Sequence, residues 1–141
     1  MGKRRKAREL VLQILYAFEI SGERIEEVLA DALEHQKPPS DVAEFTTLLV
    51  TKTVENLREI DELIAQKVKR WELSRIAVVD RNILRLAICE LLHFSDIPQK
   101  VSINEAIELA KTYSTTESGR FVNGILDSVA GLRGSQGSLM P

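Results

Sequence analysis

Residues 83–92 are apolar on nearly every face of a helix, and no other stretch constrains the fold as strongly. Between Ile83 and Leu92 only Arg85 and Glu90 carry a charge. A helix that is apolar all round has to be covered by other elements on all sides. We therefore expect a buried central helix over residues 78–94, with 83–92 as the most buried segment of the chain.

Apolar residues in the rest of the chain recur at spacings of three and four, the period of an amphipathic helix. These stripes predict one helix over about 3–20 and another from Ile25 to just before Pro38. A longer pattern runs over residues 42–68 and drifts around residues 52–56. Because a pattern of this length exceeds a typical helix, we expect a kink or break there.

Two capping boxes mark the expected starts of the last two helices. Ser102 is followed three residues later by Glu105, and Ser114 by Glu117, which is the spacing of the S-x-x-E motif. Residues 71–77 carry no helical stripe and are interpreted as a connector. Strand-like alternation longer than a few residues is absent from the sequence, which favours helices throughout.

The sequence therefore predicts an all-α fold, with about seven helices in two packed helical bundles that form one compact domain over residues 1–131. We expect the N-terminal bundle over about 3–70 and the C-terminal bundle over about 76–131. Gly131 is expected to end the last helix. Residues 132–141 contain Gly, Ser and Pro but no apolar stripe, so we expect a disordered tail there.

The charge of the chain is distributed unevenly. The net charge is −2, but the first eight residues carry five positive charges and no negative one, so residues 9–141 have a net charge of −7. The basic residues are Lys3, Arg4, Arg5, Lys6 and Arg8. At a helix N-terminus they oppose the helix dipole. Such an arm indicates an anionic partner, nucleic acid first and anionic lipid second, and a solvated tail explains it equally well.

Several other classes of protein are disfavoured. Cys89 is the only cysteine and cannot form an internal disulfide, so a reducing cytoplasm is the expected location. No apolar run approaches the length of a membrane span, and no signal-peptide core follows the basic start. His35 and His93 have no partners at metal-ligand spacing. We expect no catalytic residue, no metal and no cofactor.

One candidate RNA-binding face lies on the first helix. At 100° per residue, Arg5, Arg8, Leu12 and Tyr16 fall on one strip beside the apolar stripe. Two guanidiniums followed by an aromatic ring suit single-stranded nucleic acid, because charge binds phosphates and a ring stacks on bases. Changing Arg5 and Arg8 together to alanine is then expected to weaken RNA binding and leave the fold intact. Alternatively, Tyr16 lies at the rim of the core with its hydroxyl in water.

A second candidate face lies on the last helix. Phe121 falls about 90° from the centre of the apolar stripe, and Glu117, Arg120 and Gly124 lie on the same outward side. A phenylalanine beside an arginine is suited to stacking on a base. A glycine inside a helix costs about 1 kcal/mol relative to alanine, so Gly124 needs a reason. Close approach of a partner is one reason, and tight helix–helix contact is the other.

Four stretches of the sequence resemble the NusB family of bacterial transcription antitermination factors. They are RRKAREL-x-LQ-x-LY at residues 4–16, RNILRLAICEL at 81–91, KVSINEAIELAK at 100–111 and FVNGILD at 121–127. The stretches cover nearly the whole chain in the expected order. Ser114 stands where the family often has glycine, and Glu117 stands where aspartate is more usual.

The resemblance implies a non-enzymatic RNA-binding protein that works with the small-subunit ribosomal protein NusE. Together the two would hold single-stranded boxA RNA from ribosomal RNA operons and support the RNA polymerase antitermination complex. The implied RNA-binding residues, with the neighbouring basic residues of both candidate faces, are Lys3, Arg4, Arg5, Arg8, Tyr16, Lys111, Glu117, Arg120 and Phe121. Asp80, Arg81 and Asp96 are the implied contacts with the protein partner.

Two rival interpretations remain open at this point. Ribosomal RNA methyltransferases carry a similar N-terminal RNA-binding domain, and the chain could serve such a delivery role. It could also be a protein-assembly adaptor whose basic arm binds an acidic protein. The sequence does not distinguish a monomer from a homodimer.

Overall fold

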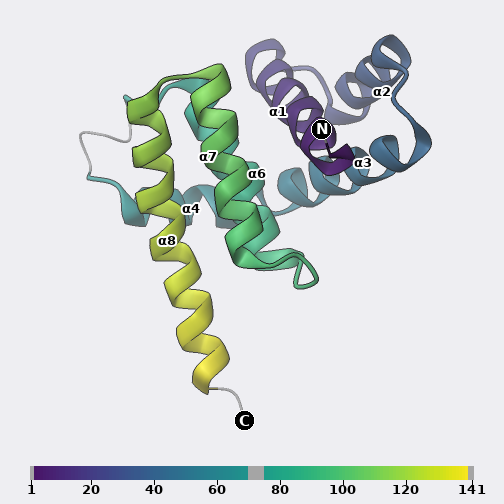
Figure 1. Ribbon diagram of the computed structural model, residues 1–141. Coiled ribbons are helices and arrows are strands. Elements are labelled where there is room, and N and C mark those ends of the chain that lie inside the picture. Colours follow the sequence, from purple (N-terminus) through teal and green to yellow (C-terminus); the bar gives the residue numbers. More distant parts are fainter. Residues whose placement is uncertain (1, 70–74, 140–141) are drawn as a thin grey trace.

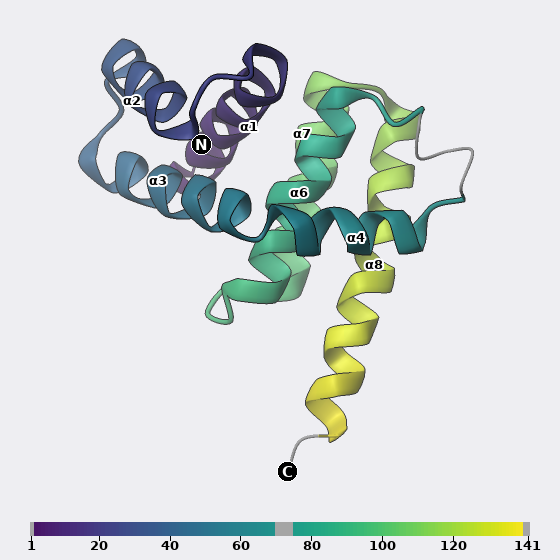
Figure 2. The same ribbon diagram turned by 180° about the vertical axis from the view of Figure 1, so that it is seen from behind.

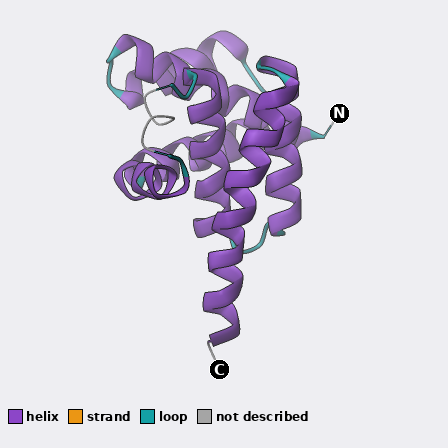
Figure 3. Cartoon of the chain, turned by 90° about the vertical axis from the view of Figure 1, so that its left-hand side faces the viewer, coloured by secondary structure: helices purple, strands orange, loops and turns teal. Residues whose placement is uncertain are grey.

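Seven helices make up the described part of the chain, residues 2–69 and 75–139 of this computed structural model. They are α1 (Lys3–Ser21), α2 (Ile25–Gln36), α3 (Ser40–Glu55), α4 (Leu57–Lys67), α6 (Val78–His93), α7 (Gln99–Tyr113) and α8 (Thr116–Leu139). The described residues contain no strand, so the predicted all-α fold is confirmed (Figure 3). Most of the connector expected at 71–77 lies outside the described residues.

Local backbone signals set the boundaries of the first helices. Gly22 follows α1 with a φ of 71°, a left-handed conformation that glycine adopts without strain, and its N–H bonds to the carbonyl of Phe18. Lys37 ends α2 in the same region, with a φ of 45°. The expected break in the long third segment is confirmed, because α3 stops at Glu55 and α4 begins at Leu57.

The centre of the molecule is α6, which packs against α1, α3, α4, α7 and α8 (Figure 1). Ile83, Leu84, Ile88, Cys89 and Leu91 all have an exposed fraction of zero. The prediction that residues 83–92 form the most buried segment is thus confirmed for this helix. Burial on every side explains why the sequence is apolar all round.

The grouping of the helices differs in one respect from the expected division near residue 70. Helix α4 packs mainly against α6 and α8, while α1, α2 and α3 pack against one another (Figure 2). The change of partner falls at Asn56, between α3 and α4. Helix α4 therefore groups with the C-terminal helices rather than with α1–α3.

Neither predicted capping box forms. Pro98 precedes α7, so Ser102 lies inside the first turns of this helix, and its hydroxyl donates to Glu90 Oε1 at 2.8 Å. For α8 the cap is Thr115, whose Oγ1 accepts the backbone N–H of Ser118 at 3.0 Å. The motif at the start of α8 is thus shifted by one residue from the prediction at Ser114.

Helix α8 continues to Leu139, past Gly131, where the sequence predicted its end. In Figure 1 its last turns extend beyond the other helices. The sequence of α8 contains no proline, and a helix tolerates single glycines such as Gly131 at about 1 kcal/mol each. Among the described helices, none combines the length and apolar character needed to cross a membrane.

Candidate nucleic-acid interface

The basic residues at the start of α1 point to different neighbours around the helix. Lys3 Nζ lies 2.7 Å from Asp41 Oδ2 of α3, in a pair that is largely exposed. Arg5 turns toward α7 and donates from Nε and Nη2 to the two carboxylate oxygens of Glu105, at 2.9 and 2.6 Å. These hydrogen bonds hold the pKa of the Glu105 carboxyl below its ordinary value. Both basic side chains therefore already have a counter-charge within the protein.

Arg8 is buried, with an exposed fraction of 3%. Its guanidinium donates to both carboxylate oxygens of Glu90 on α6, at 2.7 and 2.8 Å. Leu12 is 4% exposed. The expectation that Arg8 and Leu12 share an exposed strip with Arg5 and Tyr16 is therefore wrong. The physical reason is that α1 is covered on this side by α6 and α7, so its charged residue there needs a buried partner.

These contacts also correct the explanation of the basic start. The sequence indicated an external anionic partner or solvent for the basic residues, but Lys3, Arg5 and Arg8 are paired with carboxylates in the protein. Arg4 is exposed and lies with its guanidinium carbon 4.4 Å from the centre of the Phe45 ring. Lys6 is exposed and has no ion pair within the residues that the structure describes.

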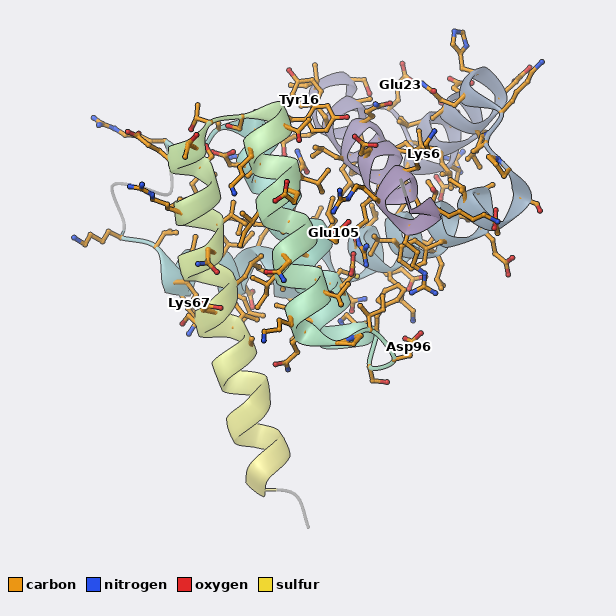
Figure 4. All side chains as sticks on the ribbon, viewed as in Figure 1. Lys6, Tyr16, Glu23, Lys67, Asp96 and Glu105 are labelled. Carbon is orange, nitrogen blue, oxygen red and sulfur yellow. The ribbon has the colours of Figure 1, made fainter. Side chains whose placement is uncertain are left out.

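Tyr16 is exposed as predicted, with 42% of its surface accessible. It lies on the second half of α1, beside the end of α7 in the view of Figure 4. Its accessible ring permits base stacking, and its position next to buried Leu15 also fits the rim of the core.

A pocket of about 300 Å³ lies where the starts of α6 and α8 meet. We call it the Phe121 pocket; its lining includes Ile76, Asp80, Thr115, Glu117, Ser118 and Phe121. Phe121 is partly buried against the core. Asp80 is 7% exposed; its Oδ2 accepts from the hydroxyl of Ser118 at 2.9 Å, and its buried Oδ1 has no hydrogen-bond partner within the described residues.

The Phe121 pocket brings together residues for which different roles were expected. Asp80 was expected to contact a protein partner, whereas Glu117 and Phe121 were expected to contact RNA, and all three line the same hollow. The pocket is lined by no residue of α1. The α6 and α8 residues instead form a separate candidate surface.

The outward face of α8 is open beside this pocket. A Cβ built on Gly124 would meet no atom within 4 Å, which excludes tight helix–helix contact as the reason for this glycine. Arg120 and Lys111 are both exposed, and Lys111 Nζ lies 4.0 Å from Glu108 Oε1. Close approach of a partner therefore remains the interpretation that fits Gly124.

The two other expected partner contacts lie apart from each other. Arg81 is bound to the carboxylate of Glu19 on α1, which lowers the pKa of that carboxyl. Asp96 is exposed in the loop after α6 (Figure 4). Because α6 has 16 residues, its two ends are about 24 Å apart. A partner that contacts both Asp80 and Asp96 would have to span the whole helix.

No group of three potential metal-ligating side chains was found in the part of the chain that the structure describes. His93 Nε2 lies 3.3 Å from Glu59 Oε1, so this histidine has an ordinary surface partner. Sequence reasoning missed the anchoring residues Glu90 and Glu105. The available signal for Glu90 was its charge inside an otherwise apolar helix, because a buried carboxylate requires a cationic partner.

Comparison with known proteins places these observations in a family. The family model described as "NusB family" matches residues 5–131. A transcription antitermination protein NusB from Symbiobacterium thermophilum is 44% identical over 144 residues, covering 96% of this chain and 94% of that protein. One from Chloroherpeton thalassium is 44% identical, but the chain spans only 60% of its length.

Solved structures agree with the sequence comparison. NusB from T. maritima superposes with a TM-score of 0.84 at 42% identity, covering 93% of this chain and 92% of that one. A crystal structure of antitermination factors NusB and NusE in complex with dsRNA gives a TM-score of 0.85 at 28% identity, covering 94% and 98%. The helices, their order and the sequence all match over nearly the full length, and the chain belongs to the NusB family.

Proposed function

We propose that this protein is a transcription antitermination factor that binds boxA-type RNA of ribosomal RNA operons together with the ribosomal protein NusE. Family membership supports this function, and so does the similarity to a NusB–NusE–RNA complex. We further propose that it acts in the cytoplasm, within the RNA polymerase antitermination complex, and that it is not an enzyme. Its relatives that are matched over nearly their whole length are named as antitermination proteins.

The Phe121 pocket is the observation that carries the RNA-binding part of this proposal. A half-buried ring offers a π-face to a base, and the exposed carboxylate of Glu117 in the same lining can accept a hydrogen bond from an N–H of the base edge. Glu117 lines the pocket, and exposed Arg120, which precedes Phe121 in the chain, is proposed to complete the base-binding site.

The basic start of α1 supplies the proposed phosphate contacts. Arg4 and Lys6 are available without breaking an ion pair to a carboxylate, whereas Lys3 and Arg5 would exchange a carboxylate for a phosphate. Arg8, which is buried against Glu90, would act by holding α1 in place rather than by touching RNA. Because each exchange breaks an existing ion pair, the affinity of the protein alone for RNA is limited. We therefore expect NusE to add much of the binding energy.

NusE is proposed to use the exposed Asp96 loop at the far end of α6. Arg81, already bound to Glu19, is proposed to keep α1 and α6 in register rather than to contact NusE directly. Tyr16 and Lys111 are both exposed and are proposed to contact the RNA outside these two surfaces.

Titration of the protein with single-stranded boxA-like RNA, with and without NusE, tests the proposal. The expected result is preference for boxA over a scrambled strand and over a duplex of the same sequence, and tighter binding with NusE. If the scrambled strand binds equally well in the presence of NusE, the protein is an assembly adaptor and the proposal is wrong.

Replacing Phe121 separates base binding from charge attraction. Phe121→Ala should cost about 1–3 kcal/mol of RNA affinity, and because the ring is uncharged, the loss should hardly depend on salt. Phe121→Tyr should keep most of the affinity, since the π-face survives. Thermal melting of the same variants is the control. A stability loss with unchanged RNA affinity in the folded fraction would show that Phe121 only packs against the core.

A further inference from the structure

Arg85, on α6, connects three helices through a network of ion pairs. Its Nε and Nη2 donate to the two carboxylate oxygens of Asp61 on α4, at 2.8 and 2.9 Å, and its Nη1 donates to Glu19 on α1. Arg81, one turn earlier on α6, donates from Nε and Nη2 to both oxygens of the same Glu19 carboxylate. We call these four residues the Arg85 network. It bonds α1 and α4 to two consecutive turns of the central helix.

The Arg85 network lies at the edge of the core rather than on the open surface. The side chains of Arg85, Glu19 and Arg81 are 12, 22 and 28% exposed. Partly buried ion pairs of this kind add little stability compared with apolar contacts. Apolar contacts are not directional, however, whereas the planar fork of a guanidinium fixes both the distance and the angle to a carboxylate. The network therefore specifies how the helices are oriented more than how stable they are.

Helix α4 holds the guanidinium of Arg85 in place. Helices α4 and α1 share at most a weak contact, so Arg85 is the link between them. Because Asp61 accepts from Nε and Nη2, the guanidinium presents Nη1 to Glu19. Asn82, which is fully buried, accepts from the same Nη1 through its Oδ1 at 3.1 Å. The direction of the hydrogen bond to Glu19 is thus set by two other side chains.

The Arg85 network is connected to both surfaces that are proposed to bind RNA. Glu19 belongs to α1, the helix whose start supplies the proposed phosphate contacts. Arg81 directly follows Asp80, which lines the Phe121 pocket and accepts a hydrogen bond from the hydroxyl of Ser118 on α8. Hydrogen bonds therefore connect α1 to the start of α6, and the start of α6 to the start of α8.

We propose that the Arg85 network sets the placement of α1 relative to the Phe121 pocket, so that one RNA strand contacts both at once. Glu19, Arg81 and Arg85 are then positioning residues that do not touch the RNA. This inference rests on the proposed function. Two linked contacts bind much more tightly than either contact alone, but only where their spacing fits the strand. The network therefore matters for strands that reach both surfaces and not for shorter ones.

The test measures the affinity for boxA-like single strands of increasing length, with NusE present. For the wild type, the affinity should rise sharply at the length that first reaches both surfaces. Glu19→Gln, which removes the charge that both guanidiniums share, should keep the affinity for shorter strands and lose this rise. The longest strand should then bind roughly 10-fold more weakly, a small part of the gain of about 100- to 10,000-fold that two linked contacts can provide.

Glu62→Gln is the matched control. Glu62 is exposed on α4, and its Oε1 lies 3.5 Å from Nε of Arg58 on the same helix, so this ion pair connects no two helices. Glu19→Gln and the control each remove one negative charge, so diffuse electrostatics alone would make both bind RNA more tightly. The control should show the wild-type rise. Arg81→Lys keeps the net charge but cannot donate to two oxygens in parallel, so it should lose part of the rise.

Thermal melting of the same variants separates positioning from folding. A variant that is less stable has a smaller folded fraction, which lowers the apparent affinity for every strand by the same factor. Loss of the positioning role lowers the affinity for the long strands only. If Glu19→Gln weakens the binding of short and long strands equally, the network acts on the fold alone and the inference is wrong.

The remaining outcomes separate this inference from the proposed function. If the wild type binds boxA RNA without a sharp rise in affinity with length, one strand does not use both surfaces; the inference is then wrong and the function stands. If Glu19→Gln and Glu62→Gln bind strands of every length alike, the network has no positioning role. If the wild type binds no boxA RNA at any length, the proposed function itself fails.

Discussion

Arg8 and Glu90 form a buried ion pair that ties α1 to the central helix α6. The hydroxyl of Ser102 donates to the same carboxylate, so α7 joins the network as well. A buried ion pair of this kind stabilises the fold little more than an apolar pair of similar size, because burial removes the hydration of both charges. Removing one partner is costly, however, since the other charge is then left alone in the core.

Arg8→Met is therefore expected to destabilise the fold by about 3–5 kcal/mol, and Glu90→Met by a similar amount. The double variant Arg8→Met/Glu90→Met should recover much of this loss, because no charge remains unpaired. Urea denaturation of the three proteins measures these differences. This replaces the expectation from the sequence that alanine at Arg5 and Arg8 leaves the fold intact. If the double variant loses as much stability as each single variant, the energetic coupling between Arg8 and Glu90 is contradicted.

The Arg5–Glu105 pair makes stability depend on pH in the acid range. Arg5 lowers the pKa of the Glu105 carboxyl below the ordinary value of 4.5, so the folded state holds the carboxylate more strongly than the unfolded state does. The resulting stabilisation is present above about pH 4.5 and is lost as the pH falls through the folded pKa. Glu105→Gln should therefore be less stable than the wild type at neutral pH.

The difference between Glu105→Gln and the wild type should shrink as the solution is made acidic, and denaturation at several pH values measures it. The same variant leaves Arg5 without its carboxylate partner, so we expect tighter RNA binding together with lower stability. Weaker RNA binding would instead mean that Glu105 holds Arg5 in the orientation that meets a phosphate.

At the scale of the helices, the sequence predicted well which segments are helical. It predicted poorly the residue at which each helix begins. The stripes of α1 and α2 and the break at Asn56 follow from apolar periodicity and local breakers, both of which are local properties. The capping-box positions failed because Ser102 and Glu105 are used for contacts with α6 and α1, which lie far away in sequence. A local motif cannot reveal that a distant arginine competes for the same carboxylate.

The same reasoning explains which parts of the candidate site could be predicted. Phe121 was placed at the edge of its stripe from helical geometry alone, and the structure finds it partly buried. The role of Arg8 was misjudged because its angle on α1 says nothing about which helices cover that face. The pocket lined by Lys6, Lys37 and Tyr113 joins α1, the loop after α2 and the end of α7, and only the tertiary fold brings these together.

Gly124 offers a test at the scale of a single helix. Its position inside α8 weakens the helix, and a methyl group added there would meet no neighbouring atom. Gly124→Ala should therefore stabilise the protein by about 0.5–1 kcal/mol, measured by denaturant unfolding. If a partner approaches the backbone at this point, RNA or NusE binding should weaken in the same variant. Unchanged stability would contradict the expectation that glycine weakens α8 at this position.

At the scale of the whole molecule, α6 is the element that every other part except α2 contacts, and its burial links the candidate surfaces at its two ends. Asp80 lies near its start, Glu90 near its end, and Asp96 in the loop beyond. Binding at one end of α6 can alter the structure at the other end only if α6 moves as a unit against α1 and α7. The buried Arg8–Glu90 pair opposes such movement, so we expect a rigid platform.

Cys89, in the last third of α6, can report whether the molecule opens as one unit. Its exposed fraction is zero, and burial raises the pKa of its thiol to about 11. Because the thiolate is the reactive form, a thiol reagent at mildly alkaline pH should label the folded protein hardly at all, and should label it fully in urea.

Any slow labelling without urea should occur only through the small unfolded fraction, so its rate should match the unfolding equilibrium. Arg8→Met should accelerate this labelling. Adding boxA RNA with NusE should slow it, since a ligand that binds only the folded state stabilises that state. Fast labelling that neither RNA nor Arg8→Met alters would mean that α6 opens locally, and the rigid platform would then be wrong.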